Sequence, residues 1–429
     1  MAATREIREL PVFSELDDPG WGRDFSWITD DLFQREYQGP MQTSWGGLVV
    51  YRNADIAALL KSRDVSHQSA AAALAGIEEF EPPLAALSEF FRNSTFTMWP
   101  PQHTPHKRLI AAPLAPAAIS PFADRFAQMV RARIGCALEA GALDFLTEFA
   151  QPLVAEFWSH ALDIPLAQCE RLIKVAHDIV ESFLLAPTPD ALQTADAGAR
   201  EYIDTLSSAL RRTAERGTST LVDKLVADYE AMEAGPAKPA DPFYAFSLAL
   251  LDGFNTLGAG MASLVHTLLD ADVDLAKQKG DIASVARLGF LEATRLHPPV
   301  AMTMREAVND FVLEDVAIPK GSAILVLWLF GNRDPEFFPD PDRFVLEREN
   351  RIRQYTFAGG AYACAGRNIV QMLGEIVLSE LSKAGVSIDR NGPAVWGEGS
   401  MIHELDALPL RFTRAVVDAG VPAAGGVSS

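Results

Sequence analysis

The chain has 429 residues, of which 48% are hydrophobic, and a formal net charge of -20 at pH 7. This acidity argues against a nucleic acid partner, because phosphate backbones bind basic surfaces. We find no apolar stretch of membrane-spanning length, and the N-terminus lacks the apolar segment of a signal peptide. A cytoplasmic protein without a membrane anchor is therefore expected.

A single domain is expected over residues 1–429, because no linker, internal repeat or change of composition divides the chain. Its ordered core is expected over about residues 12–414, between loose tails at 1–11 and 415–429. Hydrophobic patterning predicts a mainly α protein with a small β-sheet subdomain. In chain order, the expected helices are Phe122–Ala140, Phe145–Leu162, Leu166–Phe183, Ala191–Glu215 and Pro242–Leu269. The expected strands are Gly47–Tyr51, Phe311–Leu313, Ser322–Leu327 and Leu408–Phe412.

The last of these helices carries a candidate functional residue. Its run from Tyr244 to Met261 is too apolar for a surface helix and is expected to be buried. Asp252 lies in this run, and a buried carboxylate is costly unless it is paired, protonated or functional. Alternatively, Asp252 is turned away from any pocket and bonds to a neighbouring helix.

Farther along the chain, Glu292 and Arg295 are three residues apart in a predicted helix that ends at Pro298 and Pro299. This spacing places the two side chains on one helix face, where they can pair. Taken alone, such a pair is most often a solvated surface pair of little energetic value.

Near the C-terminal end, Cys364 follows Gly359 and Gly360 and precedes Gly366. Glycines allow the backbone to turn tightly and to approach a flat group closely. A helix is predicted from about Arg367, and its N-terminus favours thiolate over thiol. The alternative for a lone cysteine is a small buried hydrophobe, which is how we interpret Cys136 and Cys169.

These motifs together resemble the signature pair of the cytochrome P450 family, namely Phe357xxGly360xxxCys364xGly366 and Glu292xxArg295. In that family the cysteine thiolate is the axial ligand of haem b. The resemblance extends from about residue 20 to 413. It implies the P450 fold, a triangular prism with the haem between the central helix and the cysteine loop, with Glu292 and Arg295 as a structural ion pair.

The resemblance also implies a set of haem contacts: His103, Lys107, Arg108, Arg305, Phe357, Gly360, Tyr362 and Gly366, with Cys364 as the metal ligand. Two of these residues depart from the family pattern. Lys107 stands where the family usually has arginine, so it offers a point charge in place of a bidentate fork. Tyr362 stands where histidine is often found, and its hydroxyl can donate only one hydrogen bond.

On the central helix, the resemblance places Asn255 at the position of the family's acid and Thr256 at that of its alcohol, a pair that relays protons for oxygen activation. Asn255 cannot carry a proton as a carboxylic acid does, whereas Thr256 can hold a water molecule. We hypothesise that Asp252 replaces the missing acid or anchors a polar or cationic group of the substrate. Alternatively, Asn255 is a water-bonding spacer and protons arrive by another route.

The function that the resemblance implies is a haem-thiolate monooxygenase that uses O2 and two electrons from a ferredoxin and its ferredoxin reductase. Its substrate is expected to be a mostly apolar small metabolite of secondary metabolism. One alternative is a haem-thiolate enzyme of non-inserting chemistry, such as oxidative coupling, ring formation, dehydration or peroxide-driven oxidation. Another is a non-catalytic recruitment module. The sequence leaves open the substrate, the reaction subtype, the redox partner and the oligomeric state.

Two groups of residues bear on these partners. Basic residues gather around the expected haem face and can steer an acidic electron donor toward it. Alternatively, these residues only neutralise the haem propionates and cap helices. The basic residues are Lys107, Arg108, Arg351, Arg353 and Arg367. A largely apolar substrate pocket is expected from Phe80, Phe90, Phe91, Phe96, Met302, Met304 and Met401.

Overall fold

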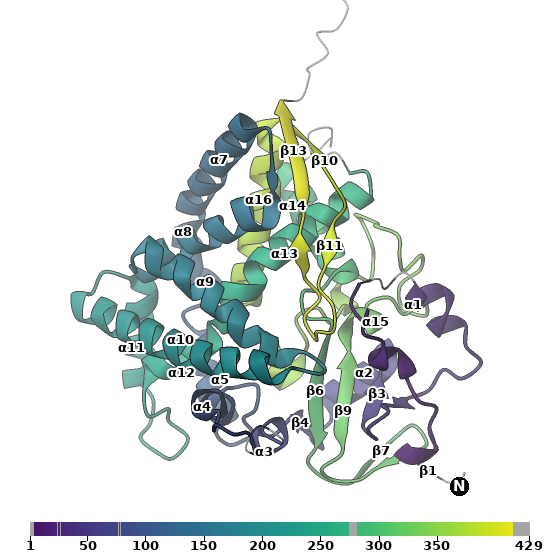
Figure 1. The fold of residues 1–429 in the computed structure, drawn as a ribbon. Coiled ribbons are helices and arrows are strands. Elements are labelled where there is room, and N and C mark those ends of the chain that lie inside the picture. Colours follow the sequence, from purple (N-terminus) through teal and green to yellow (C-terminus); the bar gives the residue numbers. More distant parts are fainter. Residues whose placement is uncertain are drawn as a thin grey trace, which may run out of the picture.

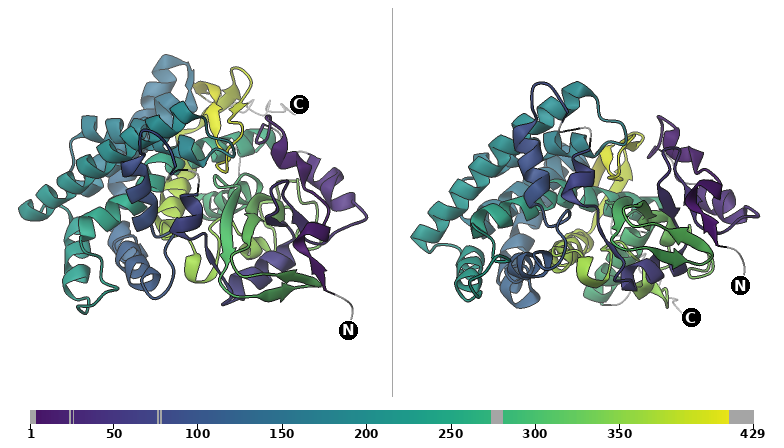
Figure 2. Two further views of the ribbon diagram at one scale, coloured as in Figure 1. Left: turned by 60° about the horizontal axis from the view of Figure 1, so that its bottom comes forward. Right: turned by 90° about the horizontal axis from the view of Figure 1, so that it is seen from below.

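The computed structural model describes residues 4–23, 25, 27–75, 77, 79–273 and 281–414. Long helices gather on one side of the molecule, and the largest sheet lies on the other with the N-terminal segment (Figure 1). The two further views show the same division (Figure 2). The long helices include α7 (Ala123–Ala140), α8 (Gln151–Leu162), α9 (Leu166–Val180), α10 (Pro189–Arg216), α13 (Leu251–Asp270), α14 (Ile282–Leu296) and α16 (Arg367–Ala384). The fold class is mainly α, as the sequence predicts.

The expected helices are confirmed, with differences at their ends. α7 ends before Gly141, whose φ of 75° is readily adopted only by glycine. α8 is preceded by a π-helical turn over Phe145–Ala150, and α9 continues into a 3-10 turn over Glu181–Phe183. α10 begins two residues earlier than expected, because the Thr188 side chain caps it by accepting a bond from the Ala191 N–H.

The largest sheet has five strands in the order β2-β3-β9-β6-β4. Their bounds are Met41–Gln42, Leu48–Val50, Ala323–Leu327, Met302–Ala307 and Val65–His67. β3 and β9 fall in expected strands, as do β7 (Phe311–Leu313) and β13 (Pro409–Arg414) of the smaller sheets. β4 and β6 were not among the expected strands. Their antiparallel register sets His67 opposite Arg305.

The N-terminal segment differs from its prediction. β1 (Arg5–Glu6) pairs with β8 (Val316–Ile318), and the Arg5 guanidinium donates two hydrogen bonds to Asp315 at 2.8 and 2.7 Å. Ile7 and Leu10 are buried. Strand pairing and two buried apolar side chains therefore hold residues 5–10 in place, so a loose tail over 1–11 is wrong for this part. The predicted tail at 415–429 lies outside the described residues, and a single domain over 1–429 stays a prediction.

The segment Pro242–Asp270 is divided at Leu250 into α12 (Pro242–Ala249) and α13. It is long and apolar enough to cross a membrane by length and composition, which corrects our reading that no such stretch exists. However, 67% of its most apolar window is buried inside the fold. Against this helix, the Trp158 indole in α8 donates to the Gly253 carbonyl at 2.8 Å. The burial is that of a core helix, as the sequence predicts.

Candidate functional site

The cysteine loop precedes α16 and presents the thiol of Cys364. The Cys364 N–H donates to the Phe357 carbonyl at 2.9 Å, which closes the loop. Gly360 has φ of +64°, and a Cβ there would lie 2.9 Å from the Leu60 carbonyl oxygen, so only glycine fits. A Cβ on Gly366 would lie 3.7 Å from the Cys364 sulfur. The glycine therefore leaves free the space beside the thiol.

The thiol of Cys364 is accessible to solvent although many protein atoms surround it. Burial raises its pKa above the ordinary value and Asp252 raises it further, whereas Lys107 and backbone N–H groups of Gly366 and Arg367 lower it. The helix-end effect predicted from the sequence acts in the expected direction, but burial outweighs it. A bound cation would reverse this balance, because a coordinating thiol loses its proton.

Asp252 and Thr256 lie one turn apart on one face of α13. The Thr256 hydroxyl donates to the Asp252 carbonyl at 2.8 Å. Asp252 is exposed, so the expected fully buried carboxylate is wrong, but the surrounding protein atoms still raise the pKa of its carboxyl to about 6, and the charge of Lys107 acts against this rise. Asp252 also acts on the pKa of Cys364, so the carboxyl and the thiol are close enough to interact. Within the described part of the chain, no hydrogen bond ties the Asp252 carboxylate to a neighbouring helix.

Asn255 follows Asp252 by three residues on α13, so the two side chains lie about 60° apart around the helix and share one broad face. Its amide nitrogen Nδ2 is buried without a hydrogen-bond partner, and its side chain lies near the Glu404 carboxyl, next to β12 (Leu405–Ala407). Burial raises the pKa of Glu404 to about 7; His177 lowers it, while Asp406 and Glu181 raise it. Sequence reasoning missed Glu404, because nothing in its local pattern marks it as a carboxyl with a raised pKa.

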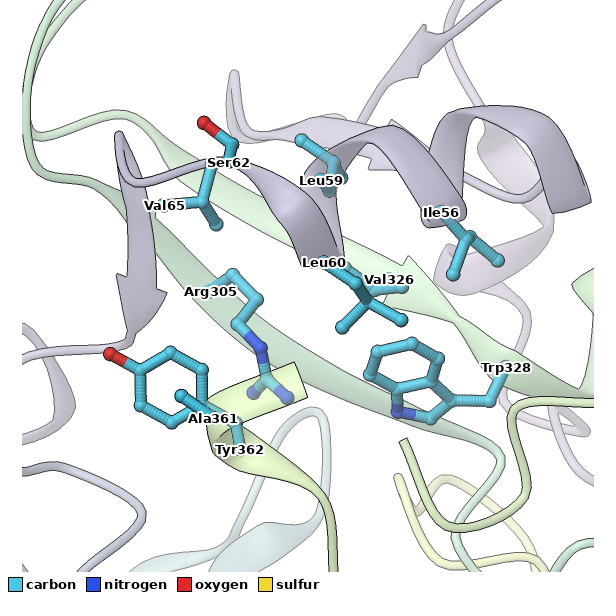
Figure 3. A pocket seen from close by; sticks show the side chains of 10 residues that line it. All are labelled: Ile56, Leu59, Leu60, Ser62, Val65, Arg305, Val326, Trp328, Ala361 and Tyr362. Atoms are coloured by element: carbon cyan, nitrogen blue, oxygen red, sulfur yellow. The ribbon is translucent and has the colours of Figure 1, made fainter. Parts of the chain in front are cut away.

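A second group of predicted residues meets beside the cysteine loop. His103 and Lys107 are one turn apart on α5 (His103–Ala111). The His103 and Tyr362 ring centroids are 4.7 Å apart. The Arg305 guanidinium reaches between two rings, 5.5 Å from the Trp328 centroid and 5.8 Å from that of Tyr362 (Figure 3). Arg305, Trp328 and Tyr362 line a cavity of about 60 Å³.

This group contains a buried cation, Arg305, without an anionic partner among the described residues. Arg305 is 4% exposed and donates to the Met304 carbonyl and to His67 Nδ1, both at 3.0 Å. Burial lowers the pKa of Arg305 to about 10, and it also lowers the pKa of Lys107. His103 Nε2 is buried without a hydrogen-bond partner. Buried cations are normally paired, and among the described residues no carboxylate pairs with Arg305, so the group is suited to an anionic ligand.

Arg108 does not lie with His103, Lys107 and Arg305 beside the cysteine loop. It is exposed, one residue away from the α5 face that His103 and Lys107 share. Phe357 lies on the other side of the loop, where its ring stacks on Phe290 with centroids 6.3 Å apart. A direct contact of Arg108 with a bound cofactor therefore stays a prediction.

Glu292 and Arg295 form a buried network. Arg295 donates to Glu292 at 3.0 and 2.8 Å and to the carbonyls of Asn332 and Pro341 at 2.8 and 2.7 Å. Arg348, which sequence reasoning missed, donates to Glu292 at 2.8 Å. Arg295 is 0% exposed, so a solvated surface pair is wrong. The network ties α14 to the segment before the cysteine loop.

Two other expectations concern the surroundings of the site. Phe90 and Met302, expected to line a substrate pocket, are both 0% exposed, which is typical of core residues.

Among the residues that the structure describes, no group of three histidine, cysteine or acidic side chains is placed to hold a metal ion. The single thiol of Cys364 is compatible with a metal whose other ligands belong to a cofactor.

Comparison with known proteins gives concordant matches. The family model described as Cytochrome P450 matches residues 290–381. The chain is 25% identical to cytochrome P450 CYP199A2 of Rhodopseudomonas palustris, over 74% of this chain and 75% of the relative. It is 24% identical to the 6-deoxyerythronolide B hydroxylase of Saccharopolyspora erythraea, over 75% of this chain and 79% of that protein. The crystal structure of P450BioI in complex with an acyl carrier protein matches with a TM-score of 0.78 at 17% identity, over 90% of this chain and 100% of that chain.

Proposed function

The chain belongs to the cytochrome P450 family of haem b monooxygenases, and on that premise we propose that Cys364 provides the thiolate ligand of the haem iron. The position of the thiol carries this proposal. Cys364 lies on a loop closed by its own N–H, next to Gly366, and it interacts with Asp252 of the central helix. This arrangement leaves room beside the sulfur for a flat group.

The residues beside the loop fit the two carboxylates of haem b. Arg305 is a buried cation without a carboxylate partner among the described residues, and His103 Nε2 is a buried donor or acceptor without a partner. Lys107 adds a second charge. We assign these three residues to the haem propionates, because a buried cation is stable when an anion compensates it.

A bound haem b with a thiolate ligand supplies the chemistry of O2 activation. The protein's part is to move protons and to orient the substrate. The Thr256 hydroxyl both donates and accepts, so it can take a proton at Oγ1 and pass it on. The Asp252 carboxyl, with a pKa of about 6, exchanges its proton near neutral pH. Asn255 carries no proton itself.

Asp252 has two candidate roles, as a proton donor and as an anchor for a polar or cationic substrate group. Asp252→Asn keeps the size and the hydrogen bonding but removes the charge and the acid, whereas Asp252→Ala removes everything. Loss of product with normal substrate binding in Asp252→Asn supports the proton role, and loss of the substrate-induced spin shift supports the anchor. Unchanged substrate binding and unchanged turnover in both variants would contradict both roles of Asp252.

The substrate class and the electron donor extend this proposal. We assign a mostly apolar small metabolite of secondary metabolism, supported by similarity to the 6-deoxyerythronolide B hydroxylase. A ferredoxin with its reductase is the proposed donor. Ile352 is 83% exposed between Arg351 and Arg353 in a 3-10 turn ahead of the cysteine loop. An apolar side chain ringed by cations suits an acidic docking partner.

The main test is reduction of the purified protein under CO. A thiolate-shifted Soret band in the wild type, lost in Cys364→Ala, is expected. A Soret band without that shift in the wild type would contradict thiolate ligation and would leave the non-catalytic alternative. Localisation in the cytoplasm stays a prediction from the sequence.

Asn255 favours a second candidate function. Because the helix lacks a carboxylic acid at this position, protons can be in short supply for oxygen insertion, and non-inserting or peroxide-driven chemistry is the alternative. Turnover with O2, ferredoxin and reductase is compared with turnover with peroxide alone. Product only with peroxide would replace the monooxygenase proposal by the alternative.

A further inference from the structure

At position 362, two residues before Cys364, the cysteine loop carries a tyrosine whose hydroxyl is engaged away from the cation group. The hydroxyl of Tyr362 lies 2.6 Å from the Ser66 hydroxyl in β4, so its hydrogen bonding is directed to that strand. What Tyr362 presents to the cation group is its ring, over which the Arg305 guanidinium lies at 5.8 Å. An aromatic face stabilises a cation, but it cannot donate a hydrogen bond to a carboxylate.

The neighbouring residue of β4, His67, does carry a suitable donor. Its Nδ1 lies 3.0 Å from Arg305 Nη1. Because a guanidinium only donates, Nδ1 must accept, and the proton of the neutral ring is then on Nε2. Burial, followed by the charges of Arg305, His103 and Lys107, holds the pKa of His67 well below its ordinary value. The ring is therefore a neutral group with one N–H free to donate.

His67 is held firmly among the residues assigned to the propionates. Its ring contacts that of Tyr362 edge-on with centroids 4.2 Å apart, and the His103 ring lies 5.7 Å away. Its backbone carbonyl accepts a bond from the Trp99 indole at 2.7 Å. The pairing of β4 with β6 also fixes the His67 backbone directly opposite Arg305. A side chain fixed from several sides is pre-organised for binding.

We propose that His67 anchors the haem in this protein: its Nδ1 fixes the Arg305 guanidinium, and its Nε2–H donates to a haem carboxylate. Strand β4 then supplies the donor that the cysteine loop lacks at Tyr362. This inference rests on the haem site proposed above. The alternative is that His67 is only a packing residue of the sheet.

The rate of haem transfer to excess apomyoglobin tests the proposal on the ferric holoprotein. His67→Ala should speed haem loss about tenfold or more, which is the factor for one hydrogen bond to a charged group. Its reduced CO complex should keep the thiolate-shifted band, because Cys364 is untouched. His67→Gln keeps an N–H donor and should lose haem more slowly than His67→Ala. His160→Ala, at an exposed position on α8, is the matched control.

Rescue separates anchoring from packing. Tyr362→His in the His67→Ala background returns a donor to the loop and should restore slow haem loss, although it refills no space in β4. Haem loss at the wild-type rate in His67→Ala, or no rescue in the double variant, would overturn the proposal. If His67→Ala does not fold, His67→Leu, which fills more of the space and also lacks an N–H donor, takes its place in both comparisons. A wild type without a thiolate band would instead contradict the haem site itself.

Discussion

Arg295 and Arg305 are almost equally buried, with 0% and 4% of their surface exposed, but their surroundings are opposite. Arg295 has the Glu292 carboxylate and three backbone carbonyls as acceptors. Arg305 has one carbonyl and one neutral imidazole. The first network is complete within the protein, whereas the second lacks an anion. The difference indicates which buried arginine serves the fold and which one serves a ligand.

The largest expected effect is at Glu292. Glu292→Gln leaves Arg295 and Arg348 buried without a compensating charge, and breaking a buried pair in this way costs about 3–5 kcal/mol. The midpoint of urea unfolding, followed by circular dichroism, should fall strongly. Asp342→Asn is the matched control, because the partner carboxylate of Arg333 is 42% exposed and should contribute less than about 1 kcal/mol. Equal losses of stability in both variants would contradict the view that the buried Arg295 network is essential to the fold.

The sharpest test of the comparison uses one substitution at both arginines. Arg295→Met should destabilise the protein, because it leaves Glu292 buried with only one of its two cations. Arg305→Met replaces an uncompensated cation by an apolar chain and should leave the apoprotein as stable or more stable. The same Arg305→Met variant should lose haem about tenfold faster or more. Urea unfolding of the apoproteins and haem transfer measure the two quantities, and similar behaviour of both variants would refute the contrast.

A smaller effect, dependent on pH, is expected at Glu404. Its folded-state pKa is about 7, above the ordinary 4.5, so the folded protein keeps a proton that the unfolded chain releases. Stability should therefore fall as pH rises from about 4.5 through 7, and Glu404→Gln should remove this loss. Thermal unfolding of both proteins across this range measures the difference, with Glu233→Gln at an exposed position as the control. Parallel pH curves for wild type and Glu404→Gln would contradict a raised pKa.

The smallest effect is expected at Tyr362. Tyr362→Phe removes the hydrogen bond to Ser66 but keeps the ring, and one such bond contributes about 1 kcal/mol. The urea midpoint should fall slightly, while haem loss should stay unchanged because the hydroxyl is not assigned to the haem. Faster haem loss in this variant would mean that the tyrosine hydroxyl, and not His67, provides the donor.

Motifs with fixed local spacing could be recognised in the sequence. Glu292 and Arg295 are three residues apart, and Cys364 is bracketed by glycines, so each carries its own signal. Their partners come from distant segments. His67 is 238 residues from Arg305, and Arg348 is 56 residues from Glu292. Nothing near these residues marks them, because their role arises only when β4 pairs with β6 or when the segment before the cysteine loop folds onto α14.

Strand prediction failed for a related reason. β6 has the sequence Met302–Ala307 with two charged residues, and its burial does not alternate cleanly. Its inner position in the sheet, between β9 and β4, buries Arg305 despite the charge. At the N-terminus, Ile7 and Leu10 lack periodicity, yet pairing of β1 with β8 places them in the core. Tertiary contacts override local patterns in both regions.

The bond from the Trp158 indole to the Gly253 carbonyl bears on how substrate preference can change. A Cβ at residue 253 would lie 3.0 Å from the indole ring, so the two helices touch at this point without any spacer. The position of α13 is therefore set in part by α8. Substitutions beneath that indole would shift Asp252 and Thr256 together, and variants with altered selectivity need not carry a single change among the residues that touch the substrate.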